Sequence, residues 1–344
     1  MPLKAMIADV INGRDLTFTQ AEEAMNIIMN GEATSAQIGS YLTALRMKGE
    51  TVDEIAGSAQ SMRAHVVAVA VPNLAPGDML VDTCGTGGDG KHTFNISTTA
   101  AFVVAGAGVR VAKHGNRAAS SKSGSADVLL ALGGNLDITP AQVADCVNDV
   151  GIGFLYAIHH HPAMRFAIGP RREIGQRTIF NVLGPLTNPA GATHQLIGVY
   201  SPALTEPLAA VLGKLGSQAA YVVHGADGLD ELSTTGVNLI SYLKNGAVST
   251  HELDPQDLGL ARATLDDLTG GTPQENARMA HDILSGTDQG PRRDIVLLNA
   301  AAALGVADDD LAAGLARARA CIDNGRALAT LEAWVAKTNS FVRD

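Results

Sequence analysis

Apolar positions in the first 70 residues recur at helical spacing and predict three short amphipathic helices. The first has capping-box spacing between Thr19 and Glu22 ahead of its apolar face. The three predicted helices run from about Thr19 to Gly31, Ser35 to Met47, and Thr51 to Ala70. Because they are joined by brief turns, they indicate a small helical bundle at residues 1–72.

A linker with Pro72, Pro76 and Gly77 separates this part from a region where strands and helices alternate. Predicted strands lie at 79–81, 109–112, 153–156, 194–200 and 220–224, with helices between them, one of them at 95–107 and one beginning at Thr139-Pro140. A hairpin is predicted around Asn245-Gly246, and the chain from 274 to 341 is predicted to be mostly helical. Such alternation is typical of a parallel sheet covered by helices on both faces. The predicted fold class is therefore α/β, with a small N-terminal helical domain and a larger domain at 78–344 built on a mainly parallel central sheet.

A glycine-rich loop directly follows the first predicted strand. Four of the six residues from 85 to 90 are glycine, and a helix opens after them with Asn95, Ser97 and Thr98. Backbone N–H groups of such a loop and of a helix N-terminus converge on anions, which predicts a phosphate site. The loop has neither the Walker A pattern nor GxGxxG, so a dinucleotide site is not favoured.

A second polar loop follows the next predicted strand. Residues 113–125 contain three cationic side chains, one histidine and four serines. Asp230 and Glu231 come shortly after another predicted strand, 220–224. Because ligands of a parallel sheet bind at the carboxyl ends of its strands, we expect both loops and this acidic pair to face one pocket.

Charge and composition limit the partners of this pocket. The chain of 344 residues has 25 Lys+Arg against 35 Asp+Glu, hence a net charge of -10, and only 4% aromatic residues. This argues against a nucleic-acid surface, and alone it would also disfavour an anionic substrate. Residues 81–125, however, carry a net charge of +3, so the positive charge is concentrated where the two loops meet.

The chain ends and cysteines favour a cytoplasmic protein. We find no signal-peptide pattern and no apolar run long enough to span a membrane. Cys84, Cys146 and Cys321 are too widely spaced for a disulfide framework or a zinc site. Cys84 has no adjacent base and is predicted to pack rather than act as a nucleophile. The run from His159 to His161 is not expected to bind a metal, because consecutive side chains do not readily converge on one ion.

Three stretches together resemble the anthranilate phosphoribosyltransferases of tryptophan biosynthesis. They are GTGGDGKHTFNIST (85–98), KHGNRAASSKSGSADVL (113–129) and RTIFNVLGPLTNPA (177–190). The resemblance covers nearly the whole chain. The glycine loop alone is also found, in looser form, in pyrimidine nucleoside phosphorylases of the same fold, whereas the 113–129 stretch is more specific.

The resemblance implies transfer of the phosphoribosyl group of 5-phosphoribosyl 1-diphosphate (PRPP) to the amine of anthranilate, with release of pyrophosphate. It implies an active site at the hinge between the two domains, helical residues around 162–183 joined to the helical domain, and a homodimer formed through that domain. It also implies Mg²⁺, with two ions per subunit. Nucleic acid and membranes are not expected as partners.

The resemblance carries the family's site residues onto this sequence. The implied PRPP-binding residues are Gly85, Gly88, Asp89, Thr93, Asn95, Ile96, Ser97, Thr98, Lys113, His114, Gly115, Asn116, Arg117, Ala118, Ala119, Ser120, Ser121 and Ser125. The implied anthranilate-binding residues are Gly85, Asn116 and Arg171, with His114 nearby. The implied magnesium ligands are Ser97, Asp230 and Glu231. No general base is assigned, although His114 is the candidate.

Each assignment has an alternative that the residues alone leave open. Arg171 suits a bidentate carboxylate clamp, but Arg171 and Arg172 could equally be a surface pair on a helix. Asp230 and Glu231 suit magnesium, but they could also be favourable charges at a helix N-terminus. For the whole chain, the alternatives are a pyrimidine nucleoside phosphorylase and a non-catalytic nucleic-acid-binding relative. The second would require a basic surface, and the sequence pI is about 5.4.

Overall fold

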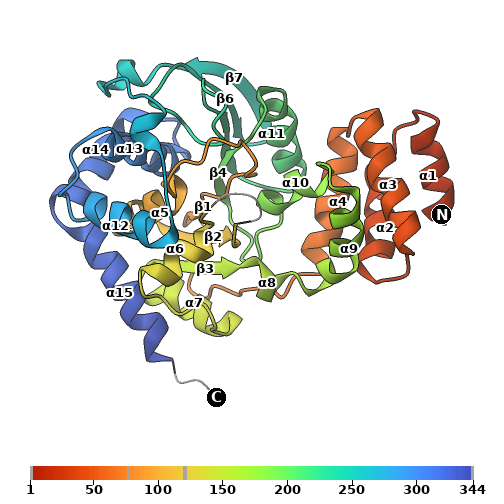
Figure 1. Cartoon of the computed structure of the whole chain (residues 1–344), viewed down its shortest axis with the longest axis horizontal. Coiled ribbons are helices and arrows are strands. Elements are labelled where there is room, and N and C mark those ends of the chain that lie inside the picture. Colours follow the sequence, from red (N-terminus) through yellow and green to blue (C-terminus); the bar gives the residue numbers. More distant parts are fainter. Residues whose placement is uncertain (1–2, 76, 119–121, 342–344) are drawn as a thin grey trace.

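A helical bundle at the N-terminal end stands beside a larger α/β domain in the computed structural model (Figure 1). The structure describes residues 3–75, 77–118 and 122–341. The bundle is formed by α1 (Leu3–Ile11), α2 (Phe18–Met29), α3 (Ser35–Lys48) and α4 (Val52–Ala64). Helix α2 packs against α4, and α1 packs against α3.

The bundle differs from the sequence prediction at the beginning of α2. The Gln20 N–H donates to the hydroxyl of Thr17 at 3.3 Å, and the Gln20 side chain accepts from the Thr17 N–H at 2.9 Å. The predicted capping box at Thr19 and Glu22 is therefore wrong, because the cap lies two residues earlier with the same spacing. Helix α1 was not predicted.

The third predicted helix begins where it was expected but is shorter than predicted. Thr51 caps α4 in a capping box with Glu54, and the helix ends at Ala64 rather than at Ala70. The chain beyond it forms hydrogen bonds with distant segments instead. Val67 N–H donates to the carbonyl of His160 at 2.9 Å, and Val69 N–H donates to that of Pro189 at 3.0 Å. These tertiary partners override the local helical pattern.

The α/β domain is built on a sheet whose described strands have the order β3-β2-β1-β4-β5-β6-β7. The strands are β1 (Leu80–Asp82), β2 (Arg110–Gly115), β3 (Ile152–Tyr156), β4 (His194–Gly198), β5 (Ala219–His224), β6 (Asn238–Lys244) and β7 (Ala247–Leu253). The first five are parallel, and β6 and β7 are antiparallel additions at one edge. The predicted fold class is confirmed.

The turn between β6 and β7 is the predicted one. Asn245 and Gly246 adopt positive φ values of 50° and 81°, as a two-residue hairpin of this type requires. Strand β2, in contrast, is longer than predicted and extends to Gly115. Lys113 and His114 therefore stand on a strand and not on a flexible loop.

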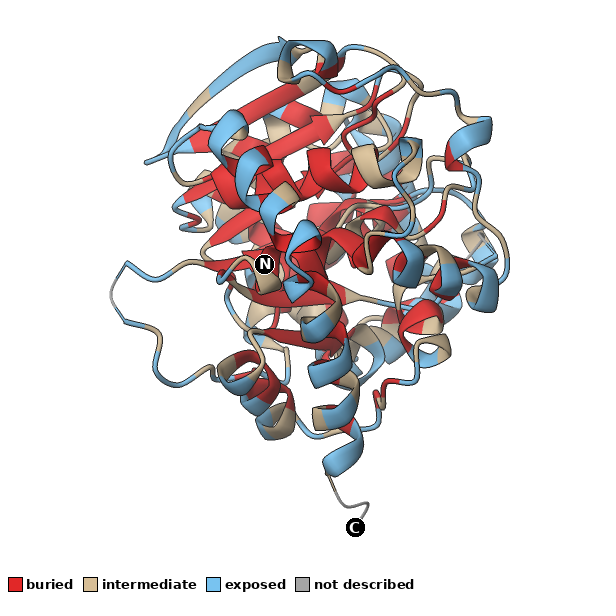
Figure 2. Ribbon diagram, turned by 90° about the vertical axis from the view of Figure 1, so that its left-hand side faces the viewer, coloured by how far each residue is buried: buried red, intermediate tan, exposed pale blue. Residues whose placement is uncertain are grey.

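Helices cover both faces of the sheet. The α-helices that follow the bundle are α5 (Ile96–Gly106), α6 (Ser125–Ala131), α7 (Pro140–Asp149), α8 (Ala157–His160), α9 (Arg165–Ile174), α10 (Phe180–Leu183), α11 (Thr205–Lys214), α12 (Pro273–Leu284), α13 (Pro291–Gly305), α14 (Leu311–Asp323) and α15 (Arg326–Ser340), of which α9 and α10 pack with the bundle. Figure 2 shows the inner strands buried and the outer faces of the helices exposed, whereas the edge strand β7 is mostly exposed. No helix in the described part of the chain is long and apolar enough to cross a membrane.

Alternate residues of the central strands enter two different cores. Leu196 and Tyr221 pack in the core that contains α5 and α13, whereas Ile197 and Val222 belong to the core that contains α11 and the helical bundle. The bundle is thus continuous with one face of the sheet. The domain boundaries at residues 72 and 78 stay a prediction, and Pro76 of the predicted linker lies outside the described residues.

The segment from α9 to α10 packs with the bundle although it lies 100 residues later in the chain. Helix α9 packs against α3 and α2, and α10 packs against α4 (Figure 1). Arg63 of α4 adds a polar connection, since it donates to the carbonyls of Leu186 at 2.7 Å and Leu215 at 3.0 Å. This later segment therefore lies with the bundle in space and connects it to the α/β domain.

Candidate active site

The candidate site lies where the strand order reverses. β1 is bordered by β2 on one side and β4 on the other, so the chain leaves β1 in one direction and later fills the sheet in the other. Such a switch point opens a crevice at the carboxyl ends of the strands. The glycine loop follows β1, residues 116–124 follow β2, and the acidic pair follows β5.

The glycine loop adopts a backbone conformation that only glycine tolerates readily. Gly87 and Gly88 have φ values of +68° and +79°. The Gly87 N–H donates to the carboxylate of Asp230 at 2.6 Å. The N–H groups of Gly88 and Asp89 have no protein acceptor among the described residues, so this part of the loop presents free donors for an anion.

Gly85 allows the acidic segment to approach the glycine loop. A Cβ atom at this position would lie 2.8 Å from Oδ2 and 3.1 Å from the carbonyl oxygen of Asp230. The close contact leaves no room for a side chain. The predicted site residues Gly85 and Asp230 are therefore brought together, although 145 positions of sequence separate them.

Asp230 and Glu231 form a half-buried acidic pair beside the first turn of α5. The backbone N–H of Ser97 donates to Oε1 of Glu231 at 3.1 Å. Burial raises the pKa of both carboxyls; for Asp230, the charges of Glu231 and Asp89 raise it further, and for Glu231, that of Asp89. No helix follows the pair in the chain, but Glu231 accepts from the first turn of α5, so the alternative of a negative charge at a helix N-terminus does apply to Glu231. The site thus offers carboxylate and hydroxyl oxygens and carries net negative charge. Mg²⁺ prefers oxygen ligands of this kind.

Lys113 supplies the positive charge next to this pair from inside the sheet. Its ammonium is buried and donates to the carbonyl of Thr83 at 2.8 Å and to the hydroxyl of Ser97 at 3.3 Å. Its charge opposes the upward shift of the Glu231 pKa. Lys113 thus joins β1, β2 and α5 and is not a free surface cation.

The loop after β2 is organised by Asp127 of α6. Its carboxylate accepts from the N–H groups of Ala118 at 3.1 Å and Gly124 at 2.9 Å, and it lies 3.9 Å from the guanidinium of Arg117. The Ser125 hydroxyl donates to the carbonyl of Asn116 at 3.1 Å. The predicted residues Ala119, Ser120 and Ser121 lie outside the described residues.

Asn95 connects this loop to the glycine loop. Its amide Nδ2 donates to the carbonyl of Ser123 at 3.3 Å, and its Oδ1 accepts from Nδ2 of Asn276 at 2.9 Å. The side chain therefore bridges the two loops and α12. Of its predicted neighbours, Thr93 forms an isolated bridge with Thr269, and Ile96 and Thr98 are buried in the first turn of α5.

His114 is held in one tautomer by its surroundings. Its Nδ1 lies 3.1 Å from the carbonyl oxygen of Gly184, which only accepts, so Nδ1 bears the proton. Its Nε2 lies 3.1 Å from Nε2 of His161 and accepts from it. Burial, with the neighbouring His161, lowers the pKa of His114 to about 3, and burial lowers that of His161 to about 4. A neutral imidazole with both nitrogens engaged is poorly suited to act as the general base.

Cys84 lies in a closed polar cluster with Asp82 and His114. Ligand atoms of these three residues lie within 4.8 Å of one another. The Asp82 carboxylate already accepts from the His114 N–H at 3.1 Å and from Asn188 at 2.7 Å. Burial and the charge of Asp82 raise the pKa of the Cys84 thiol, which keeps it protonated. The arrangement favours packing over nucleophilic chemistry.

Arg171 lies on α9, on the bundle side of the site. Its guanidinium is 5.0 Å from the centre of the Phe180 ring and makes no hydrogen bond or ion pair within the described residues. Burial lowers its pKa. The structure does not bring it into contact with Gly85 or Asn116, the other residues implied for anthranilate.

Residues outside the predicted set also contribute to the site. Asn276 holds Asn95, Asn188 holds Asp82, His161 holds His114, and Arg177 donates to the Gly88 carbonyl. Arg177 and Asn188 fall inside the 177–190 stretch, so the motif itself was a signal for them. Asn276 lies in a helix without any comparable pattern, and only the tertiary structure identifies it.

The fold and this site define a two-domain glycosyltransferase. Residues 4–66 match the family described as "Glycosyl transferase family, helical bundle domain", and residues 77–328 match "Glycosyl transferase family, a/b domain". The chain is 59% identical over 341 residues to the anthranilate phosphoribosyltransferase of Moorella thermoacetica, covering 98% of this chain and 99% of that protein.

Solved structures agree with this class. The crystal structure of anthranilate phosphoribosyltransferase from Thermus thermophilus superposes with a TM-score of 0.91 at 43% identity, covering 97% of this chain and 99% of that one. The Saccharomyces cerevisiae enzyme in complex with PRPP and Mg has a TM-score of 0.88 at 30% identity, covering 98% of both chains. The chain belongs to the anthranilate phosphoribosyltransferase family.

Proposed function

We propose that the crevice between the glycine loop and the loop after β2 binds PRPP, with Ser97, Asp230 and Glu231 as magnesium ligands. As a member of its family, the chain is an enzyme that transfers the phosphoribosyl group of PRPP to anthranilate in tryptophan biosynthesis. The observation that carries the assignment of the site is the pair of unengaged N–H groups at Gly88 and Asp89 beside the acidic pair. Free donors and clustered carboxylates together suit a diphosphate with its divalent cation.

The acidic and basic residues of the crevice have different proposed roles. Magnesium, which Ser97, Asp230 and Glu231 would hold, would supply positive charge that neutralises the pyrophosphate leaving group. Two ions per subunit are proposed, because the adjacent side chains Asp230 and Glu231 contact different elements, the glycine loop and α5. Lys113 holds the Ser97 hydroxyl and the Thr83 carbonyl in place by donating a hydrogen bond to each.

We place anthranilate on the bundle side of the crevice, near Arg171 and Asn116. The guanidinium of Arg171 lies over the Phe180 ring but has no hydrogen bond or ion pair among the described residues, so it is available to clamp the substrate carboxylate. Attack of the aromatic amine on the ribose C1 needs no prior deprotonation. Catalysis then depends on positioning and charge stabilisation rather than on a strong base, in line with the fully engaged ring of His114.

The assembly and location remain proposals as well. A homodimer through the helical bundle is supported by exposed apolar side chains there, such as Ile11 on α1 and Met47 on α3, which are 65% and 84% exposed. Sedimentation at several protein concentrations tests this dimer. A cytoplasmic location stays a prediction.

The function is tested by following anthranilate fluorescence with PRPP and magnesium, each omitted in turn. The expected result is a loss of fluorescence only when both are present. Turnover of a nucleoside with inorganic phosphate, without PRPP, would instead support the phosphorylase alternative. The family assignment gives that alternative no support.

A further inference from the structure

Arg177 holds the glycine loop from the side of the helical bundle. It lies in the short segment between α9 and α10, and its Nη2 donates to the carbonyl oxygen of Gly88. Its guanidinium lies 4.2 Å from the centre of the Tyr200 ring. Both Arg177 and Gly88 are exposed, so this contact is not part of a hydrophobic core.

The contact determines which way one peptide unit of the loop faces. The Gly88 carbonyl and the Asp89 N–H belong to the same planar trans unit, so they point in opposite directions. With the carbonyl directed at Arg177, the Asp89 N–H is directed away from it. Because Gly87 and Gly88 both have positive φ and glycine visits either sign of φ, this unit would otherwise turn over easily.

Asp230 fixes the neighbouring part of the loop in the same manner. Its carboxylate accepts from the Gly87 N–H at 2.6 Å. Asp230 therefore fixes the orientation of one peptide unit by accepting from the Gly87 N–H. Arg177 fixes a second unit, two units further along the chain, by donating to the Gly88 carbonyl. The free N–H of Gly88 lies between these two attachments, and the free N–H of Asp89 belongs to the peptide unit that Arg177 holds.

Tyr200 supports both partners of the contact. Its ring lies against the Arg177 guanidinium, an arrangement that attracts a cation to an aromatic face. Its backbone N–H donates to the hydroxyl of Thr86 at 3.2 Å, and the Thr86 N–H donates to the carbonyl of Gly198 at 2.9 Å. Tyr200, which follows β4, thus supports the glycine loop directly and also holds Arg177, which orients the Gly88 carbonyl.

We propose that Arg177 is a positioning residue that keeps the Asp89 N–H directed at the diphosphate of PRPP, with Tyr200 holding the guanidinium in place. The inference rests on the proposed PRPP site. It adds a role for the first residue of the 177–190 stretch, which the sequence marks only as a family signature. Arg177 acts through the loop backbone and does not touch the reacting atoms.

The first test compares Arg177→Ala, Arg177→Lys and the matched control Arg172→Ala in the full-length enzyme. Arg172 is an exposed arginine on α9 without a hydrogen bond or ion pair among the described residues. In Arg177→Ala, the KM for PRPP should rise by about tenfold, the loss expected for a charged hydrogen bond, with less change in kcat. The KM for anthranilate should stay unchanged, and Arg177→Lys should recover part of the loss.

The second test asks whether Tyr200 and Arg177 act together. Tyr200→Phe keeps the ring and should behave as the wild type, whereas Tyr200→Leu should raise the KM for PRPP in the same direction as Arg177→Ala. The double variant Arg177→Ala/Tyr200→Leu should lose less than the two single variants predict together. Thermal unfolding shows whether each variant is still folded. Calorimetric binding of PRPP with magnesium measures affinity without relying on turnover.

The outcomes separate this inference from the assigned activity. A wild type that forms no product from PRPP and anthranilate would contradict the activity itself. An active wild type, with Arg177→Ala indistinguishable from Arg172→Ala, would overturn the positioning role alone. Equal increases in the KM for PRPP and anthranilate, or strictly additive effects of Arg177 and Tyr200, would also overturn it.

Discussion

Ser97 and Glu231 are 134 residues apart in the chain, and the N–H of Ser97 donates to Oε1 of Glu231 at 3.1 Å. This bond joins the first turn of α5 to the loop after β5, so a helix N-terminus, a hydroxyl and two carboxylates share one edge of the sheet. The same edge carries the Asp230 bond to Gly87. Magnesium dependence and loop geometry are therefore expected to be linked.

Replacing the two carboxylates by amides should remove magnesium-dependent turnover. In Asp230→Asn/Glu231→Gln, the shape is kept while the negative charge is lost, and kcat/KM should fall by about 100-fold. A magnesium titration of activity measures the effect. Asp227→Asn is the control, because Asp227 lies in the same loop but accepts from Ser233 at 3.1 Å and Thr235 at 2.5 Å instead. An unchanged magnesium titration in the double variant would place the ions elsewhere.

Arg171→Ala should weaken anthranilate binding far more than PRPP binding. A charged pair to a carboxylate predicts an increase of about tenfold or more in the KM for anthranilate. Arg171→Lys should recover only part, since a point charge does not reproduce the bidentate geometry. Steady-state kinetics with each substrate varied in turn gives both constants. Equal losses for the two substrates would count against a carboxylate clamp.

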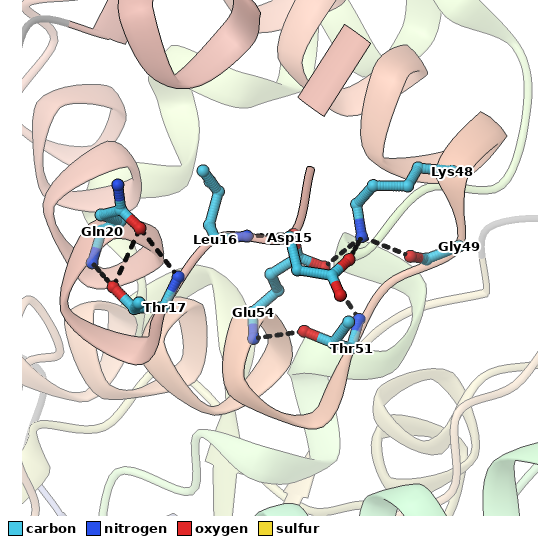
Figure 3. A network of polar contacts seen from close by, with 8 residues as sticks. All are labelled: Asp15, Leu16, Thr17, Gln20, Lys48, Gly49, Thr51 and Glu54. Atoms are coloured by element: carbon cyan, nitrogen blue, oxygen red, sulfur yellow. Dashed lines mark hydrogen bonds and ion pairs between the residues drawn. The ribbon is translucent and has the colours of Figure 1, made fainter. Parts of the chain in front are cut away.

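A buried ion pair in the bundle predicts a stability effect away from the site (Figure 3). Glu54 is fully buried and accepts from Leu16 N–H at 3.0 Å and from Lys48 Nζ at 2.9 Å. Lys48→Met would leave this carboxylate without its cation, and the free energy of unfolding should fall by about 3 kcal/mol. Denaturant unfolding measures the change.

The control for this prediction is an exposed pair of the same type. Lys214 lies 2.9 Å from Asp53, with side chains 50% and 46% exposed. Lys214→Met should lower the free energy of unfolding by less than about 1 kcal/mol. If the two variants lost the same amount, the burial of Glu54 would not be the cause.

The neutral pair His114–His161 predicts a loss of stability in acid. Both pKa values are lowered from 6.5, to about 3 for His114 and about 4 for His161, so the unfolded chain binds protons that the folded one does not. Stability from this pair is complete above pH 6.5 and is lost as the pH falls toward the folded values.

His161→Asn keeps a donor toward His114 while it removes one titrating group. Between pH 6.5 and 4, its unfolding free energy should fall less steeply than that of the wild type, by up to about 1.4 kcal/mol per pH unit. Urea unfolding at a series of pH values measures this slope. His251→Asn on the exposed strand β7 serves as the control, and parallel curves for His161→Asn and the wild type would refute the prediction.

The sequence predicted the strands and most helices because their patterns are local. The hairpin at Asn245-Gly246 and the cap at Thr139-Pro140 follow from backbone preferences of those residues, and both occur. The end of α4 did not follow, because the N–H groups of Val67 and Val69 donate to the carbonyls of His160 and Pro189. The local sequence pattern contains no information about such distant partners.

By itself, the sequence determined the fold class, the family and the stretches that line the crevice, since these depend on periodicity and on short motifs. Only the tertiary structure decided what each side chain does there. It placed Lys113 inside the sheet, engaged both nitrogens of His114, and put Arg177 on the Gly88 carbonyl. The physical reason is that a hydrogen bond needs two groups in one place and orientation, and for residues distant in the chain the packed fold alone sets both.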